Sequence, residues 1–373
     1  MAARLKVLHT ITGLEAGGAQ SSLLTLIQHL PNHAHHVVAL KDVEPFGSHI
    51  RALGVPVDGL EMSAGPALVS GGARFAQLLA RVRPQVIHSW LYHADLFAGL
   101  AGRVSGIPVL WHVHVSDLDP SGVKRTTRWV AKQCAALSAV LPRRIIACSR
   151  ATERVHRALG YKGMEVVSNG VDTERFRPRP RDRSTLGLSR EHFLVGIIAR
   201  FDLQKDLTTF LDAAARLHSR LPNARFLLAG AGMDEHNATL ATWIRARQLE
   251  DVTLRLGFRD DVECLYPMLD VFSLSSRSEA LPMSLLEAMA SETLSVVTDT
   301  GDNASVLGSL GWVVPPRAPE ALCHAWLEAS ERSELERKRL GAAARQRVLD
   351  RYSAREHARR FAGIYSELAA QGL

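Results

Sequence analysis

Short apolar runs rich in β-branched residues alternate with segments of helical periodicity along the whole chain. Strands that alternate with helices form βαβ units, so this pattern predicts an α/β fold with parallel sheets in both halves. The runs expected to be strands in the first half are Lys6–Ile11, His36–Leu40, Val86–Ser89, Pro108–Val113, Arg144–Cys148 and Glu165–Val167. Those in the second half are Phe193–Ala199, Arg225–Ala229, Val252–Leu256, Val271–Ser275, Leu294–Thr298 and Gly311–Val314.

Two domains also follow from the length of 373 residues, because single hydrophobic cores tend to split beyond about 250–300 residues. The boundary is expected in Phe176–Arg183, where two prolines restrict the backbone and the charged side chains favour solvent. The first domain would then span residues 1–178 and the second 179–353. A closing helix is expected at 354–373, since apolar residues recur there at helical spacing.

Composition argues against several classes of protein. With 46% hydrophobic and 22% charged residues, the chain is expected to fold around a sizeable core. Its four cysteines are far apart and show no C-x-x-C spacing, which argues against a disulfide framework and a zinc site. We find neither a leader-like apolar segment nor an apolar run of about 20 residues, so a cytoplasmic location is expected.

The positive charge is concentrated in the first half of the chain. The net charge of +7 divides into +9 for residues 1–180 and −2 for the remainder. Within Lys124–Lys162, ten basic residues accompany one acid and an apolar run, a composition that suits peripheral contact with an anionic membrane face. A solvated helical face would explain the same stretch equally well.

The first loop with possible chemistry follows the strand that ends at Ile11. Gly17 and Gly18 lie there, directly before a helix with apolar residues at core spacing. Glycines let a ligand approach the backbone, and a helix N-terminus attracts an anion. A glycine-rich turn without a ligand is the alternative.

A second loop, Arg200–Asp206, follows the strand at Phe193–Ala199. Arg200 and Lys205 lie at the carboxyl end of this strand, and Asp206 is a plausible helix N-cap. A guanidinium and an ammonium in such a place are suited to clamp a diphosphate and could replace a metal ion. The alternative is a pair of surface cations.

The third loop carries two carboxylates, Glu279 and Glu287, with Pro282 between them. Eight residues of continuous helix would separate them by about 12 Å, so they could not act on one atom from a helix. Pro282 fits the first helical turn, which places Glu279 in the loop and Glu287 in the helix. One carboxylate could then bind a sugar while the other accepts hydrogen bonds from ribose hydroxyls.

The spacing of these two carboxylates matches the Glu-x7-Glu motif, and the chain from 256 to 290 resembles family 4 retaining glycosyltransferases nearly throughout. Other similar segments are Val167–Asp172, Cys148–Ser149 and the Gly230-Ala-Gly232 turn. The resemblance covers essentially the whole chain. It implies a GT-B fold: two Rossmann-like domains facing across a cleft, donor in the second, acceptor in the first, and a final helix that crosses back to the first.

The resemblance also implies a donor site. Its expected members are Gly17, Gly18, Arg200, Lys205, Gly230, Glu279, Ala280, Leu281, Pro282 and Glu287. Arg200 and Lys205 would hold the diphosphate, Glu287 the ribose, and Glu279 the sugar hydroxyls together with the amides of the adjoining loop. The family also places a histidine after a strand of the first domain, beside the donor sugar. His114 is the preferred candidate and His112 the alternative, so the expected catalytic set is His114, Glu279, Arg200 and Lys205.

The implied activity is transfer of a hexose, with retention, from a UDP- or GDP-sugar to a hydroxyl of a growing glycan. Cell-surface polysaccharide or lipid-linked oligosaccharide is the expected acceptor class. No metal, no other cofactor and no nucleic-acid partner are expected. Two residues depart from the family pattern: Ser305 stands where many relatives have an acid, and Ala280 where many have glycine.

Several patterns invite other interpretations. Asp117-Leu-Asp119 is formally a metal-binding D-x-D, but it lies outside the expected donor domain. The histidines 33, 35 and 36 could suggest a metal, although a surface turn is the preferred interpretation. The glycines near 230 lack the third glycine of a dinucleotide-binding dehydrogenase.

Two further alternatives stay open from the sequence. A GT-B nucleotide-sugar epimerase would use similar diphosphate contacts, but the Glu-x7-Glu motif argues against it. A non-catalytic membrane or nucleic-acid-binding module would explain the basic first half. It would not explain four charged residues in ligand-side loops.

Overall fold

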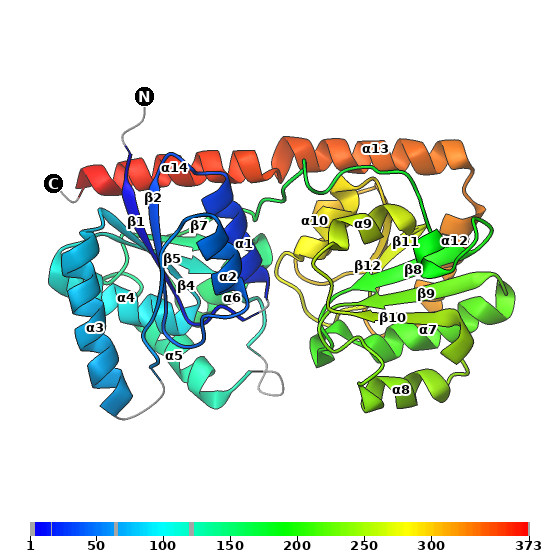
Figure 1. The fold of residues 1–373 in the computed structure, drawn as a ribbon, viewed down its shortest axis with the longest axis horizontal. Coiled ribbons are helices and arrows are strands. Elements are labelled where there is room, and N and C mark those ends of the chain that lie inside the picture. The colour runs from blue at the N-terminus through cyan, green and yellow to red at the C-terminus, as the bar shows by residue number, and fades with distance from the viewer. Residues whose placement is uncertain (1–3, 16, 63–65, 119–122, 372–373) are drawn as a thin grey trace. The chain divides into compact units, whose positions relative to one another are not determined.

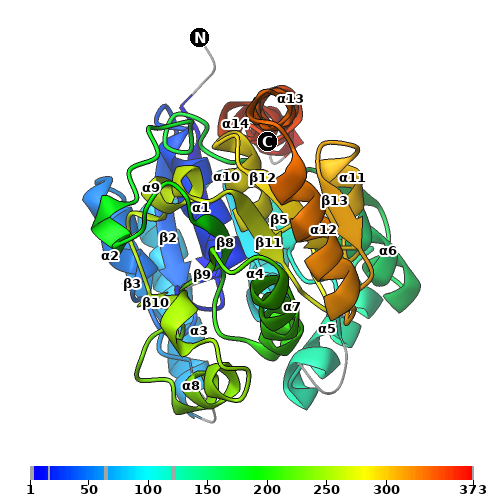
Figure 2. The same cartoon turned by 90° about the vertical axis from the view of Figure 1, so that its right-hand side faces the viewer.

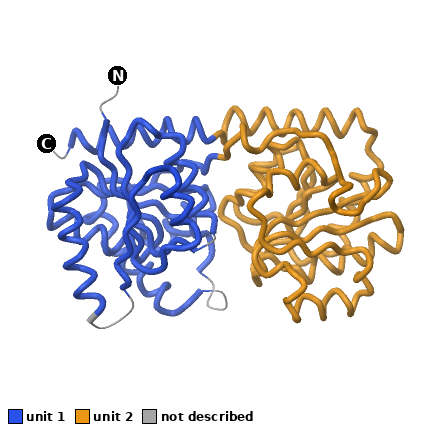
Figure 3. The backbone as a smooth tube through the Cα atoms, viewed as in Figure 1, with its two compact units in different colours: residues 1–170, 354–373 blue, residues 171–353 orange. Residues whose placement is uncertain are grey.

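The computed structural model describes residues 4–15, 17–62, 66–118 and 123–371. The chain divides into two compact units (Figure 3): unit 1 comprises residues 1–170 and 354–373, and unit 2 comprises residues 171–353. Each unit has its own sheet and its own hydrophobic core. None of the helices in the described residues is both long and apolar enough to cross a membrane.

Unit 1 contains a parallel sheet of seven strands in the order β3-β2-β1-β4-β5-β6-β7 (Figure 1). The order reverses between β1 and β4, where ligands of open α/β sheets commonly bind. The strands are β1 Lys6–Ile11, β2 Ala34–Ala39, β3 Val57–Gly59, β4 Val86–Trp90, β5 Val109–Val113, β6 Arg144–Ala147 and β7 Met164–Val166.

Helices cover both faces of this sheet, because its central strands are buried on both sides. The final helix contributes Phe361, Tyr365 and Leu368 at helical spacing to the same core as Leu23 and Ile27. The helices of unit 1 are α1 Gly18–Gln28, α2 Phe46–Ala52, α3 Pro66–Val82, α4 Tyr92–Ser105, α5 Arg125–Leu137, α6 Arg150–Leu159 and α14 Ala354–Gln371.

Unit 2 contains a parallel sheet of six strands in the order β10-β9-β8-β11-β12-β13. Helices α7 and α12 lie side by side against it (Figure 2). The strands are β8 Phe193–Ile198, β9 Ala224–Ala229, β10 Thr253–Gly257, β11 Val271–Leu274, β12 Leu294–Thr298 and β13 Trp312–Val314. The helices are α7 Leu207–Arg220, α8 Ala238–Arg245, α9 Val262–Leu265, α10 Met283–Ala290, α11 Asn303–Leu307, α12 Pro319–Glu331 and α13 Glu334–Arg351.

All twelve expected strands are present, with ends within two residues of the predicted ones. The additional strand, β3, has only three residues and lies at the edge of its sheet. One of these residues is Asp58 and another is Gly59, so no apolar run marked it in the sequence.

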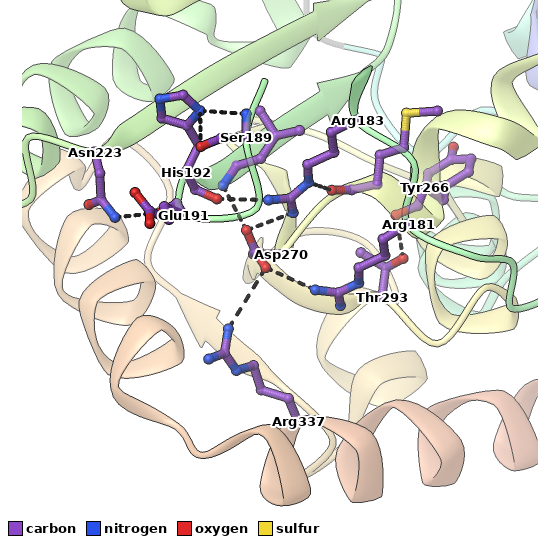
Figure 4. A network of polar contacts seen from close by, with 12 residues as sticks. Arg181, Arg183, Ser189, Glu191, His192, Asn223, Tyr266, Asp270, Thr293 and Arg337 are labelled. Atoms are coloured by element: carbon purple, nitrogen blue, oxygen red, sulfur yellow. Dashed lines mark hydrogen bonds and ion pairs between the residues drawn. The ribbon is translucent and has the colours of Figure 1, made fainter. Parts of the chain in front are cut away.

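The segment expected to be a linker belongs to unit 2 and is anchored there. Phe176 is buried in the core of unit 2. The guanidinium of Arg183 is 5% exposed and donates to the carbonyls of Met268 and His192 and to the carboxylate of Asp270. Figure 4 shows Arg181, Arg183 and Arg337 arranged around Asp270. The chain instead passes between the units at 170–171 and 353–354, so the first boundary falls before the expected residue 178.

Candidate functional site

The loop after β8 is built by local carboxylate hydrogen bonds. Asp202 accepts from the amide of Gln204 and starts a short 3-10 helix, Leu203–Lys205. Asp206 follows in the left-handed backbone region and directly precedes α7. Its carboxylate accepts from the hydroxyls of Thr208 and Thr209 at 2.8 Å. The expected N-cap position is therefore correct, but these bonds go to side chains rather than to the backbone amides of the helix.

The loop after β11 is tied to the first loop by several contacts. The amide of Arg277 donates to the carbonyl of Gln204 at 2.7 Å, and the Ser275 hydroxyl donates to the carbonyl of Lys205 at 2.7 Å. The Arg277 guanidinium also binds the buried Asp206 carboxylate at 2.7 Å. Burial opposes ionisation of Asp206, but the bonds from Arg277 and the two threonine hydroxyls outweigh it and hold its pKa below the usual value.

Lys205 and Glu279 form the centre of this arrangement. The Nζ atom of Lys205 lies 2.5 Å from Oε1 of Glu279, which also accepts from the Ser276 hydroxyl at 2.6 Å. Both side chains are largely buried, at 18% and 9% exposure. Arg200 is 51% exposed at the mouth of the same loop and pairs with Asp202 at 3.2 Å. The structure thus brings Lys205 and Glu279 together and places Arg200 in the same loop as Lys205.

The start of helix α10 falls between the two carboxylates of the Glu-x7-Glu motif, as the position of Pro282 predicted. Pro282 is the N-cap residue of α10, Glu279 lies in the preceding loop, and Glu287 lies one turn inside the helix. Glu287 Oε2 accepts from the Tyr266 hydroxyl at 2.6 Å. Burial raises the pKa of Glu287, while the bond from Tyr266 opposes the rise. The two carboxylates therefore occupy different environments and can take different roles.

Two glycines allow neighbouring backbones to come close. A Cβ atom on Gly230, which has a φ of +134°, would lie 2.0 Å from the carbonyl oxygen of Ala199. One on Gly301, with a φ of +60°, would lie 2.1 Å from the carbonyl oxygen of Glu279. Glycine is needed at both positions to shape the two charged loops. The predicted contact of Gly230 with a ligand stays a prediction.

In unit 1, Gly17 is the N-cap residue of α1. Among the described residues, no side chain caps this helix and no acid lies in its first turn. A Cβ on Gly18 would meet no described atom within 4 Å, so the approach to the helix N-terminus is open at that residue. Such a terminus favours an anion, and the contact of Gly17 and Gly18 with a diphosphate stays a prediction.

The two candidate histidines lie together at the carboxyl end of β5. The ring centroids of His112 and His114 are 4.1 Å apart. In the part of the chain that the structure describes, neither Nε2 atom has a hydrogen-bond partner. Burial lowers the pKa of His114 to about 3, so the ring is neutral near pH 7. The choice between the two residues stays open on this geometry.

The prediction of a surface turn for the histidines at 33, 35 and 36 was wrong. His33 and His35 are buried rather than in a surface turn: His35 bonds to His9 and to the carbonyl of Leu30. His36 pairs with Asp58 at 2.6 Å. Among the described residues, no group of three or more histidine, cysteine, aspartate or glutamate residues could hold a metal ion. Asp119 of the D-x-D pattern lies outside the described residues.

Several residues of the site were not predicted. Ser276 and Arg277 lie two and three residues after the end of β11, and their position after a buried strand was the signal that could have identified them. Tyr266 lies 21 residues before its partner Glu287, and nothing in the local pattern indicates that contact. A cavity of about 650 Å³ in unit 2 lies beside Asp270, at the amino end of β11, and is not part of these loops.

Family models match both halves of the chain. Residues 16–175 match Glycosyltransferase Family 4, and residues 178–347 match Glycosyl transferases group 1. Among curated relatives, the UDP-Gal:alpha-D-GlcNAc-diphosphoundecaprenol alpha-1,3-galactosyltransferase of Escherichia coli is 24% identical over 236 residues, or 61% of each chain. The EpsD protein of Bacillus subtilis is 31% identical over 56% of this chain. The chain spans 55% and 61% of the length of EpsD and of the E. coli enzyme.

Solved structures match nearly the whole chain. Anabaena Alr3699/HepE in complex with UDP-glucose superposes with a TM-score of 0.87 at 20% identity, over 98% of this chain and 100% of the other. WaaG, a glycosyltransferase involved in lipopolysaccharide biosynthesis, gives a TM-score of 0.75 at 14% identity, over 96% and 99%. These matches confirm the predicted GT-B fold. The two family models, one on each half of the chain, establish that the chain belongs to glycosyltransferase family 4.

Proposed function

We propose that this protein transfers a hexose, with retention of anomeric configuration, from a nucleoside-diphosphate sugar to a hydroxyl of a growing glycan. The observation that carries the proposal is the buried pair of Lys205 and Glu279, held by Ser276 in loops that follow β8 and β11. The carboxyl ends of parallel strands are where such sheets bind nucleotides. Solved relatives include one in complex with UDP-glucose, which supports a UDP-sugar as donor.

The charges in unit 2 suit the parts of such a donor. Arg200 and Lys205 would hold the diphosphate, and their positive charge would stabilise the leaving group without a metal ion. Glu279 would bind sugar hydroxyls beside the lysine, and the loop backbone at Ala280, Leu281 and Pro282 would complete that contact. Glu287 would accept hydrogen bonds from ribose hydroxyls; Tyr266 already donates to one of its oxygens.

The residues of unit 1 would act on the same donor. The open N-terminus of α1 at Gly17 and Gly18 would meet the diphosphate, and His114 or His112 would contact the sugar. Gly230, which follows β9, shapes the proposed site indirectly, because the absence of a Cβ lets its backbone pack against Ala199 at the start of the Arg200 loop. In this scheme, positioning and electrostatics lower the barrier, because no residue here is assigned as a covalent nucleophile.

Hydrolysis of the donor, which needs no acceptor, provides the test. The protein would be incubated in EDTA with UDP-glucose, UDP-galactose or GDP-mannose, and proton NMR would follow the released sugar. We expect the α-configured donors to give the α-anomer first, and Lys205→Met to lower the rate about 100-fold. The control Lys338→Met removes a lysine that is 72% exposed and should keep the wild-type rate. Release of the β-anomer, or equal rates in both variants, would overturn the proposal.

We also propose that unit 1 makes peripheral contact with an anionic membrane at the cytoplasmic face, where a lipid-linked acceptor would be available. Trp129 of α5 is 60% exposed, and Arg128 and Lys132 lie near it in the sequence. Val104 and Val140 are also exposed, at 90% and 61%. Exposed apolar side chains among basic ones suit such a surface. Arg144 is better excluded from it, since carboxylates of Glu165 and Glu367 bind its guanidinium.

Sedimentation with vesicles tests this contact. Wild-type protein should bind phosphatidylglycerol vesicles and not phosphatidylcholine vesicles, and Arg125→Glu with Arg128→Glu should abolish binding. The control pair, Arg216→Glu with Arg220→Glu, changes the same charge on α7 of unit 2. Binding that survives the first pair contradicts a role for α5.

A further inference from the structure

Buried histidines connect four neighbouring strands of unit 1. Rings from β2, β1, β4 and β5 follow one another with centroids 5.2, 5.4 and 5.3 Å apart; they belong to His35, His9, His88 and His112. All four are buried, and burial lowers the pKa of each ring. They are therefore neutral near pH 7, and each ring carries one proton. The hydrogen-bond partners of a ring determine whether that proton is on Nδ1 or on Nε2.

One end of this array is fixed by a backbone carbonyl. His35 Nε2 lies 2.9 Å from the carbonyl oxygen of Leu30, which can only accept, so the proton of His35 is on Nε2. His35 Nδ1 then accepts from His9 Nε2 at 3.0 Å, and His9 Nδ1 accepts from the Trp90 indole at 3.4 Å. Every ring nitrogen at this end has a partner of the right kind.

At the other end of the array, the proton positions depend on the hydroxyl of Tyr365 in α14. Its hydroxyl lies 2.7 Å from His88 Nδ1, and His88 Nε2 lies 3.2 Å from His112 Nδ1. Among the described residues, His88 is the one partner of this buried hydroxyl, so acceptance from His88 would leave both the hydroxyl proton and His112 Nε2 unsatisfied. Donation to His88 leaves His112 Nε2 and the acceptor side of the phenol oxygen unsatisfied, so the two directions leave the same number of unmade bonds. A phenol hydroxyl is a stronger donor than a neutral imidazole N–H, and an imidazole nitrogen is a stronger acceptor than a phenol oxygen, so Tyr365 donates.

The protons of two rings follow from this direction. His88 carries its proton on Nε2 and donates it to His112 Nδ1, so His112 carries its own proton on Nε2. Close by, with a centroid 6.5 Å from that of His112, His357 donates from Nδ1 to the carbonyl of Ser168 at 2.8 Å and keeps a lone pair on Nε2. Within the described residues, neither Nε2 has a partner. One is a donor and the other an acceptor, and a hydroxyl group can satisfy both.

We propose that Tyr365 and His88 are positioning residues that hold His112 in its Nε2–H tautomer, so that His112 donates a hydrogen bond to a hydroxyl oxygen of the sugar donor, with His357 Nε2 as the matching acceptor. The assignment of the hydroxyl to a sugar rests on the proposed function, whereas the assignment of the tautomer does not. The proposal also gives the two candidate histidines different roles. His112 donates the hydrogen bond to the sugar, and His114 packs against the ring of His112.

Two-bond proton–nitrogen NMR spectra of protein with 15N-labelled histidine test the tautomer, because they report which ring nitrogen carries the proton. Wild type should show His112 and His88 protonated on Nε2. Tyr365→Phe removes only the hydroxyl; each direction of the relay then leaves one donor and one acceptor unsatisfied, so His112 should show a mixture. The matched control is Tyr92→Phe, which removes another buried tyrosine–histidine bond, to His156 at 2.6 Å, outside the array.

Donor hydrolysis by the same variants tests the function of the tautomer. We expect Tyr365→Phe to lower kcat about tenfold with little change in KM, and Tyr92→Phe to leave both unchanged. A single Nδ1–H tautomer of His112 in wild type, or an unchanged tautomer and kcat in Tyr365→Phe, would overturn the proposal.

The source of the hydroxyl is tested by adding UDP-glucose, UDP-galactose or GDP-mannose to the wild-type sample. A shift of the His112 Nε2 proton resonance with one of them supports a sugar hydroxyl. No shift with a donor that the protein hydrolyses would mean that a bound water fills the place, and would overturn the contact with the sugar. If wild type hydrolyses none of them but retains the tautomer, the proposed function fails and the relay stands.

Discussion

The two units stabilise their polar interiors in different ways. Unit 1 holds twelve of the sixteen histidines, and buried neutral rings bond to one another in two pairs, His9 with His35 and His88 with His112. Unit 2 instead holds buried carboxylates in ion pairs: Asp270 with Arg183, Asp206 with Arg277, and Glu279 with Lys205. The stability that depends on neutral buried imidazoles is lost when protons bind to them. The stability that depends on an ion pair is lost when a substitution removes one partner and leaves the other charge unpaired. Acid should therefore act on unit 1, and deletion of a single charge on unit 2.

The largest effect expected is loss of unit 1 in acid. Burial lowers the pKa of His35, His156 and His357 to about 4, below 6.5 for an exposed histidine. The unfolded chain then binds more protons than the folded one, so the stabilisation is complete above pH 6.5 and is lost as the pH falls toward 4. Each such group contributes about 1.4 kcal/mol per pH unit in this window.

The indole NMR signals of tryptophans distinguish the units during such a titration. Those of Trp90 and Trp111, buried in unit 1, should disappear at a higher pH than that of Trp326 in unit 2. Simultaneous loss of all three, or earlier loss of Trp326, would remove the contrast between the units.

A smaller but still large effect is expected from Asp270→Asn in unit 2. This change leaves the guanidinium of Arg183, only 5% exposed, without its carboxylate partner, and should cost about 3–5 kcal/mol. Urea titration followed by the Trp326 indole signal measures it. As a control, Glu320→Gln removes a carboxylate that is 79% exposed and should change the midpoint little. A cost below about 1 kcal/mol would show that the pair is not needed to anchor the segment around Arg183.

The smallest effect concerns the backbone around Glu279. Gly301→Ala places a Cβ against the carbonyl of Glu279 at a positive φ, whereas Gly187→Ala has a similar φ of +68° and no described atom within 4 Å. We expect Gly187→Ala to cost about 1 kcal/mol and Gly301→Ala about 1–3 kcal/mol more. Equal costs in urea titration would mean that the Glu279 loop moves freely away from residue 301.

The sequence predicted the strands well because each is an apolar run between helical segments. It also placed Glu279 before α10 and Glu287 within it, since proline has few allowed places in a helix. The Glu-x7-Glu motif identified the family, and the family identified the GT-B fold. These features depend on residues that are close together in the chain.

Contacts between distant residues could not be predicted in this way. Lys205 and Glu279 are 74 residues apart, and only the order of β8 and β11 in the sheet brings them together. The histidines at 33 and 35 were expected in a surface turn, yet the amide of Leu5 donates to His33, and His35 bonds to His9 of β1 and to the carbonyl of Leu30. Phe176–Arg183 looked like a linker because of its prolines and charged arginines, and Asp270, which pairs with Arg181 and Arg183, lies far along the chain.

The central claim is that unit 2 holds the nucleotide of a donor without a metal ion. Calorimetric titration with UDP, GDP and ADP in EDTA tests it directly, with Glu287→Gln as the variant and Glu320→Gln as the exposed control. We expect one nucleotide to bind wild type and the control equally, and to bind Glu287→Gln about tenfold more weakly, because a charge-assisted bond to ribose is lost. Binding of none of the three, or equal binding to all three proteins, would contradict the account.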